Sequence, residues 1–139
     1  SPDSIETAIL FKNKLGIGNV DFIHRDMNEI NLPRKTFDMI IDTQSIYYSK
    51  DYLKTFVSLK KIMKTRGRLI TMPGIGEKGL IKKYIDQILG AGFSILDFRF
   101  IKTVNLGETE YLPTITCGIN IENERIDTDH ILNELFSSL

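Results

Sequence analysis

Apolar and polar positions along this chain alternate between two spacings, and the two spacings predict different elements. Five segments show short apolar runs or period-two alternation, which is typical of β-strands, and four show apolar residues at helical spacing. The predicted strands cover residues 20–24, 37–41, 68–72, 93–104 and 112–121. The predicted helices cover residues 1–15, 50–64, 79–89 and 127–139.

This order of elements predicts an α/β fold in a single domain. Strands that alternate with helices favour a mostly parallel sheet covered by helices on both faces. The last two predicted strands are joined by the short polar segment "NLGETEY". They should pair antiparallel, because a parallel pair needs a longer crossover. We therefore expect an antiparallel C-terminal strand, followed by an extra C-terminal helix within residues 123–139.

Composition and charge narrow the class of protein. The chain has 139 residues and a formal net charge of zero, so it lacks the overall basic character that favours binding to nucleic acid. No apolar run approaches the roughly 20 residues that span a bilayer, so no membrane association is expected. A single cysteine excludes a disulfide within the chain and fits a reducing, cytoplasmic location. The two histidines have no ligand partners at metal-site spacing, so no metal is expected.

Local charge is uneven, although the total is zero. The segment "LKKIMKTRGR", residues 59–68, concentrates basic residues where a helix is predicted to end. Cations suit that end of a helix because it carries the negative end of the helix dipole. The segment predicts a basic patch.

Polar side chains follow the first two predicted strands where each strand ends. The segment "FDMIIDTQSIYYSKDY" leaves an apolar strand for acid, amide and two adjacent tyrosines. In open α/β sheets, ligands bind beyond the carboxyl ends of the strands, so these residues are candidates for a binding rim. The alternative is a helix N-cap and a solvated loop, with tyrosine rings packed against the protein. The candidates are Asp26, Met27, Asp42, Thr43, Tyr47 and Tyr48.

The order of several short motifs resembles the central part of class I S-adenosylmethionine-dependent methyltransferases. In that family a strand is followed by an acid, then "LP", then "FD" opening a strand, and later a "KpGGrL" turn. The counterparts here are Asp26, Leu32-Pro33, Phe37-Asp38, "KTRGRL" and the "GAGF" of residues 90–93. The resemblance extends from about Ser1 to Ile121 and implies a Rossmann-like sheet, S-adenosyl-L-methionine as cofactor, and a small-molecule methyl acceptor.

The resemblance also implies roles for the rim residues. Asp26 matches the acid that accepts a hydrogen bond from the adenine amino group, and Met27 matches its neighbour lining the adenine pocket. Asp42 and Thr43 match the strand end near the methionine part of the cofactor. The substrate-side positions correspond to Tyr47 and Tyr48, and no catalytic base is assigned.

Two family features have no counterpart in the chain. In the family, a glycine-rich loop and a ribose-binding acid precede a helix. The segment "SPDSIETA" resembles the start of that helix. The resemblance thus implies the C-terminal portion of an incomplete methyltransferase fold, with weak or no cofactor binding. It also implies that two central strands are absent between residues 20–24 and 37–41. We expect the strands at residues 20–24 and 37–41 to pair directly, or the chain to form a homodimer through exposed sheet edges.

Two other functions are compatible with parts of the sequence. A degenerate methyltransferase-like domain can serve as a non-catalytic interaction module. Alternatively, Gly74, Gly76 and Gly79 have G-x-G-x-x-G spacing between a predicted strand and helix, with Asp97 near the position of a ribose acid in dinucleotide-binding units. Glu77 opposes that interpretation, because it puts a negative charge beside the would-be pyrophosphate.

Overall fold

The computed structural model describes residues 2–119 and 127–137. Among them, no helix is both long enough and apolar enough to cross a bilayer. The helices are α1 (Pro2–Lys14), α2 (Tyr52–Ile62), α3 (Lys78–Gly90) and α4 (Thr128–Ser137), with short 3-10 helices η1 (Met27–Glu29) and η2 (Ile46–Tyr48). The strands are β1 (Phe37–Thr43), β2 (Met63–Met72), β3 (Phe93–Asn105) and β4 (Glu108–Ile119).

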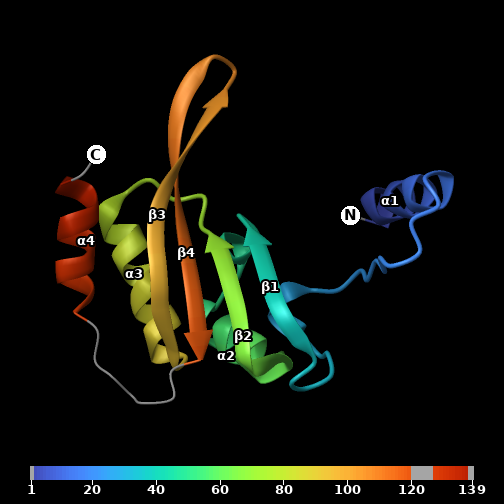
Figure 1. Cartoon of the computed structure of the whole chain (residues 1–139), viewed down its shortest axis with the longest axis horizontal. Coiled ribbons are helices and arrows are strands. Elements are labelled where there is room, and N and C mark those ends of the chain that lie inside the picture. Colours follow the sequence, from blue (N-terminus) through green and yellow to red (C-terminus); the bar gives the residue numbers. More distant parts are fainter. Residues whose placement is uncertain (1, 120–126, 138–139) are drawn as a thin grey trace.

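The four strands form one sheet in the order β1-β2-β4-β3 (Figure 1). β1 pairs with β2 in parallel, and β4 pairs antiparallel with both β2 and β3. The α/β class and the antiparallel C-terminal strand are therefore confirmed. β1, β2 and β3 all run in one direction, but only one of the three pairings is parallel, because the reversed strand β4 lies between β2 and β3.

The strands of the β3–β4 hairpin are longer, and the turn between them is tighter, than the sequence predicted. Its turn consists of Leu106 and Gly107, with φ angles of 49° and 85°. Positive φ at both central residues matches a type I′ turn, which suits the twist of a hairpin. Glu108, Glu110 and Tyr111 therefore belong to β4 and not to a loop. Figure 1 shows this hairpin projecting beyond the rest of the sheet.

The core lies on one face of the sheet, where α2 and α3 cover it. The ring of Phe56 contacts the rings of Tyr84 and Phe93, with centroids 5.2 and 6.4 Å apart. α4 lies beside α3, and the rings of Phe136 and Phe100 are 5.5 Å apart. The fully buried core side chains are Phe56, Met63, Leu69, Ile81, Tyr84, Ile85, Ile88, Phe93, Ile115, Cys117 and Leu132.

The opposite face of the sheet is open in the described part of the chain. Met39 and Ile41 of β1 are 53% and 62% exposed, and Leu96 of β3 is 52% exposed. Side chains alternate between the faces of a strand, so the neighbours Ile40 and Asp42 face the core side. The second helical layer predicted for this face is not found among the described residues.

The N-terminal segment stands apart from the sheet (Figure 1). α1 contributes no buried residue, and Phe11 and Leu15 are 56% and 68% exposed. The predicted strand at residues 20–24 is wrong, because these residues have no regular structure. Direct pairing of that segment with β1 is wrong for the same reason. A strand needs a neighbour to satisfy its backbone groups, and no strand in the described part of the chain pairs with residues 20–24.

Two element boundaries, the start of α2 and the start of β2, differ from the prediction. Asp51 caps α2 by accepting a hydrogen bond from the backbone N–H of Lys54 at 2.9 Å, so the helix begins at residue 52. β2 starts at Met63, directly after α2, and its register against β1 is interrupted between Phe37 and Met39. Within that irregularity, a Cβ on Gly67 would lie 2.9 Å from the carbonyl oxygen of Lys64, so only glycine fits. The predicted tight turn therefore lies inside the strand.

Candidate functional site

The carboxyl ends of β1 and β2 lie side by side, and the predicted rim residues Asp42 and Thr43 stand at this end of β1. Asp42 pairs with Thr71 and Thr43 with Met72 in the parallel ladder. The backbone N–H of Gln44 donates to the carbonyl oxygen of Met72 at 2.9 Å, which continues the ladder past the strand end. Gln44 then adopts a left-handed conformation with φ of 62°, which turns the chain away from the sheet. The rim loop, defined as residues 44–48, begins at this turn.

Asp42 is buried, and its carboxylate is fully engaged inside the protein. One oxygen, Oδ1, accepts from the backbone N–H groups of Ser45 and Ile46 at 2.9 and 3.0 Å and also from the Ser45 hydroxyl. The other oxygen, Oδ2, accepts from the Thr71 hydroxyl at 2.7 Å. The geometry thus makes Asp42 a cap that shapes the rim loop, which is the alternative that sequence reasoning had kept open.

Asp42 connects to the core through Thr71 and Tyr84. The hydroxyl oxygens of Thr71 and Tyr84 are 2.6 Å apart. Because Thr71 gives its single proton to the Asp42 carboxylate, the Tyr84 hydroxyl donates to Thr71. Burial raises the pKa of Tyr84, so this hydroxyl keeps its proton. Sequence reasoning missed this network, since only the register of β1 against β2 joins Asp42 to Thr71.

Asp26 lies at the end of the irregular N-terminal segment and caps η1. Its Oδ1 accepts from the backbone N–H and the side-chain amide of Asn28, both at 2.8 Å. These hydrogen bonds, the backbone one first, hold the pKa of Asp26 below its ordinary value. The side chain is exposed, so its carboxylate remains accessible to an external hydrogen-bond donor. Asp26 thus forms a turn, and its exposed carboxylate is also compatible with the expected role as an adenine acceptor.

Asn28 joins the Asp26 turn to the rim, and sequence reasoning missed it. Its Oδ1 accepts from the backbone N–H of Lys50 at 3.1 Å and from the Ser49 hydroxyl at 3.3 Å. The Ser49 hydroxyl also lies 2.6 Å from the hydroxyl of Thr55. Asp26 and the segment that follows β1 are thus brought to the same end of the sheet. No periodicity marks Asn28, which is why the sequence offered no signal for it.

Met27 and Asp42 share a small cavity between η1, β1 and α2. Its volume is about 120 Å³, and Ile41 and Ser45 also contribute to its wall. Sites for small molecules usually have about 300–1,000 Å³. This cavity is therefore too small to enclose a whole small-molecule ligand.

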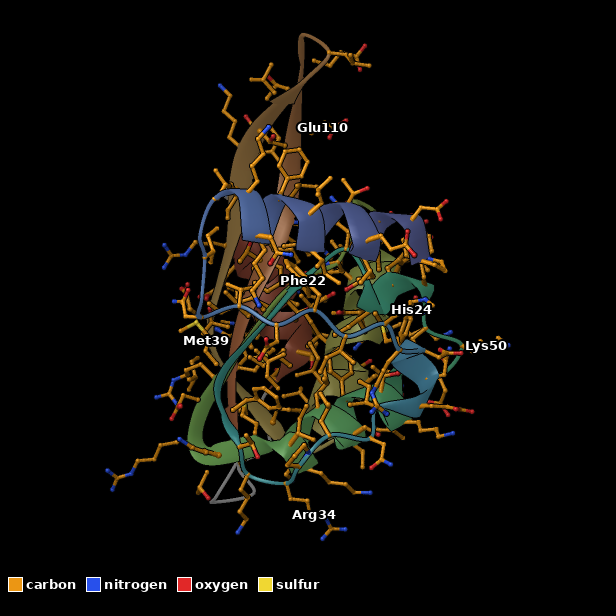
Figure 2. All side chains as sticks on the ribbon, turned by 90° about the vertical axis from the view of Figure 1, so that its right-hand side faces the viewer. Phe22, His24, Arg34, Met39, Lys50 and Glu110 are labelled. Carbon is orange, nitrogen blue, oxygen red and sulfur yellow. The ribbon has the colours of Figure 1, made fainter. Side chains whose placement is uncertain are left out.

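The adjacent tyrosines Tyr47 and Tyr48 differ in solvent exposure. Tyr47 is 38% exposed and Tyr48 is 80% exposed, and their rings pack edge to face with centroids 5.4 Å apart. The hydroxyl of Tyr52 donates to the carbonyl oxygen of Tyr47 at 3.2 Å. A core-packed ring at Tyr48 is excluded by this exposure. Figure 2 shows the neighbouring Lys50 and His24 on the same side of the molecule.

The glycine motif near α3 lacks the geometry of a dinucleotide site. Asp97 lies inside β3, where it pairs with Thr116, and its carboxylate contacts Arg99 at 2.6 Å. A ribose-binding acid would instead stand at a strand end. A Cβ added to Gly76 would meet no atom within 4 Å, so nothing in the surroundings of this residue requires glycine.

Comparisons with known proteins agree with this architecture. The family model described as a methyltransferase domain matches residues 1–85. Among solved structures, the [4+2]-cyclase SpnF has 14% identity and a TM-score of 0.73, covering 87% of this chain and 65% of that chain. A SAM-dependent methyltransferase from Aquifex aeolicus has 21% identity and a TM-score of 0.62, covering 83% and 63%. One from Methanosarcina mazei has 11% identity and a TM-score of 0.69, covering 88% and 80%. No curated protein matches the chain.

The fold and the rim at the strand ends define the class I S-adenosylmethionine-dependent methyltransferase fold. More specifically, the chain belongs to the methyltransferase domain family, whose model matches more than half of it. The cofactor of this class is S-adenosylmethionine. The chain spans slightly less than two thirds of the length of the first two structural relatives, 65% and 63%.

Proposed function

We propose that this chain forms part of an S-adenosylmethionine-dependent methyltransferase that acts on a small molecule. The observation that carries the proposal is the Asn28 bridge, because it holds the Asp26 turn against the segment after β1. The adenine-side acid and the tyrosine-bearing rim thereby share one end of the sheet. The buried free thiol of Cys117, whose pKa burial raises to about 12, suits a reducing compartment such as the cytoplasm.

In this proposal the rim residues have separate tasks. Asp26 accepts a hydrogen bond from the adenine amino group, and Met27 packs against the adenine ring. Thr43 lies at the open end of β1, near the methionine part of the cofactor. The exposed ring of Tyr48 offers an aromatic face to a sulfonium cation, which rings attract. Asp42 acts indirectly, by holding the rim loop.

We expect the chain alone to bind the cofactor only weakly, because the described cavity beside Met27 is small. S-adenosylhomocysteine should bind no more tightly than the millimolar range, about −4 kcal/mol. Titration followed by NMR should nevertheless move the backbone amide signals of Met27 and Asn28. Asp26→Ala should abolish those shifts, and Asp21→Ala, an exposed acid in the same segment, should preserve them.

Two outcomes would contradict the proposal. Micromolar binding by calorimetry would show that the chain already holds a complete cofactor site. The absence of any shift near Met27 at high ligand concentration would favour a non-catalytic interaction module.

We further propose that the chain forms a homodimer through the free edge of β1. Within residues 2–119 and 127–137 this strand pairs only with β2, so its other edge presents unpaired backbone groups beside exposed Met39 and Ile41. Unpaired, apolar strand edges favour association. Wild-type chain should sediment as a dimer in analytical ultracentrifugation, and Ile41→Lys should make it monomeric. Leu106→Lys, at a hairpin tip that is 99% exposed, should leave the dimer intact. A wild-type monomer at high concentration would refute this interface.

A further inference from the structure

A second cavity lies at the end of the sheet opposite the rim. Its volume is about 470 Å³, and it opens between the end of α2, the turn before β1 and the end of β4. All of these segments are at the amino ends of the parallel strands, away from Asp42 and the rim loop. Figure 2 shows Arg34, one of the lining residues, at the end of the molecule opposite the hairpin that carries Glu110. This cavity is therefore separate from the proposed methyltransferase site.

Four cations line this cavity, and no acidic side chain does. They are Arg34, Lys35, Lys60 and Lys61. Among the described residues none of these four forms an ion pair, although nearby Lys64 pairs with Asp38 at 2.8 Å. The chain has no net charge, so within the described residues this is a local concentration of positive charge without a paired acid. Such a site attracts anions.

The backbone around the cavity holds the cations in place. The N–H groups of Lys35 and Thr36 donate to the carbonyl oxygens of Lys61 and Ile62 at 3.1 and 2.8 Å. These bonds satisfy two carbonyl groups at the end of α2 that would otherwise repel an anion. The remaining dipole of α2 opposes anion binding, so the side-chain cations must supply the attraction.

Lys60 is positioned by the turn between α3 and β3. A Cβ on Gly92 would overlap the Lys60 Nζ, and Gly92 has a φ of 86°. Glycine at position 92 therefore leaves room for the ammonium group to lie against the turn. The side chain is half-buried, which reduces the freedom that an exposed lysine would lose on binding a ligand.

Apart from the polar residue Thr65, the rest of the wall is apolar and comes from Val57, Ala91 and Ile119. Cations beside an apolar wall match a ligand with an anionic head and an apolar body. We propose that this cavity binds a soluble organic phosphate with an apolar substituent. The volume lies within the range of about 300–1,000 Å³ found for small-molecule sites.

The test uses n-hexyl phosphate as the probe, titrated into the full chain by isothermal calorimetry. We expect saturable binding that weakens with added salt, as expected for exposed charges. Inorganic phosphate and hexanol should each bind at least about tenfold more weakly, because the first lacks the apolar chain and the second lacks the anionic group. Chemical shifts on binding should appear at the amides of Val57 and Ala91.

Matched variants distinguish the cavity from general charge. Lys60→Gln and Lys61→Gln should each weaken binding about tenfold, because each loses a charge-assisted hydrogen bond. Lys102→Gln removes the same charge from an exposed position on β3 and should leave binding unchanged. Circular dichroism of each variant confirms that the fold is retained, and the shifts at Ala91 test the site in wild-type protein if a variant unfolds.

Three results would overturn the proposal. The first is no binding of hexyl phosphate, or binding that all three lysine variants weaken equally. The second is binding to phosphatidylcholine vesicles that contain phosphatidic acid without binding of hexyl phosphate, which would assign the surface to a membrane. The third is an RNA oligonucleotide that binds more tightly and displaces hexyl phosphate, which would assign it to nucleic acid.

Discussion

The Asp42→Ala variant is expected to lose about 3 kcal/mol or more of its free energy of unfolding. Asp42 is only 4% exposed, and its carboxylate accepts hydrogen bonds from Ser45, Ile46 and Thr71. The substitution leaves these donors without an acceptor inside the protein, and each unsatisfied buried group costs about 1–3 kcal/mol. Urea denaturation followed by circular dichroism measures the loss directly.

Asp38 on the same strand provides a control that distinguishes the effect of losing a buried carboxylate from the effect of losing an exposed one. Asp38 also carries a carboxylate on β1, but its side chain is exposed and pairs with Lys64. Asp38→Ala should change stability by no more than about 1 kcal/mol, as is usual for surface ion pairs. Asp42→Asn keeps the shape and part of the acceptor capacity, so its loss should fall between the two. Equal losses for Asp38→Ala and Asp42→Ala would disprove the capping role.

The second large effect is expected for Phe56→Ala, which should cost about 3–5 kcal/mol. The Phe56 ring is fully buried between α2, α3 and β3, where it contacts the rings of Tyr84 and Phe93. Its removal leaves a cavity that rigid neighbours on three elements cannot close. Because Tyr84 also holds Thr71, a partner of Asp42, the cavity should loosen the rim loop as well.

Phe11→Ala is the matched control, because that ring lies on α1 and is 56% exposed. It should change the free energy of unfolding by less than about 0.5 kcal/mol. Thermal unfolding of the two variants beside wild type gives the comparison. A loss below about 1 kcal/mol for Phe56→Ala would mean that the helical layer does not pack on the sheet as described.

Part of the site could be inferred from local pattern alone. Asp26 and Asp42 were identified because each lies at the end of an apolar segment, and the structure brings the two segments together. Asn28, Ser49 and Thr71 were missed, because a single polar residue that reaches across the fold leaves no periodic signal. The role of Asp42 was ambiguous for the same reason, since a cap and a ligand-binding acid have the same sequence pattern.

The segment at residues 20–24 shows where local pattern misleads. Its apolar run has the composition of a strand, yet the structure has no strand there, and β1 has no second neighbour among the strands that the structure describes. The hairpin turn at Leu106 and Gly107 shows the opposite error, because strand residues around it were assigned to a polar loop. In both cases the outcome depends on whether a neighbouring strand pairs with the segment.

The sequence by itself determined the type and order of most elements, the reversal of the last strand and the family. These depend on spacing and connection length, which are local properties of the chain. Only the tertiary structure decided that the carboxylate of Asp42 faces inward, that Asn28 bridges two loops, and that four cations gather at the opposite end. These features depend on strand register and helix packing, which join residues far apart in the chain.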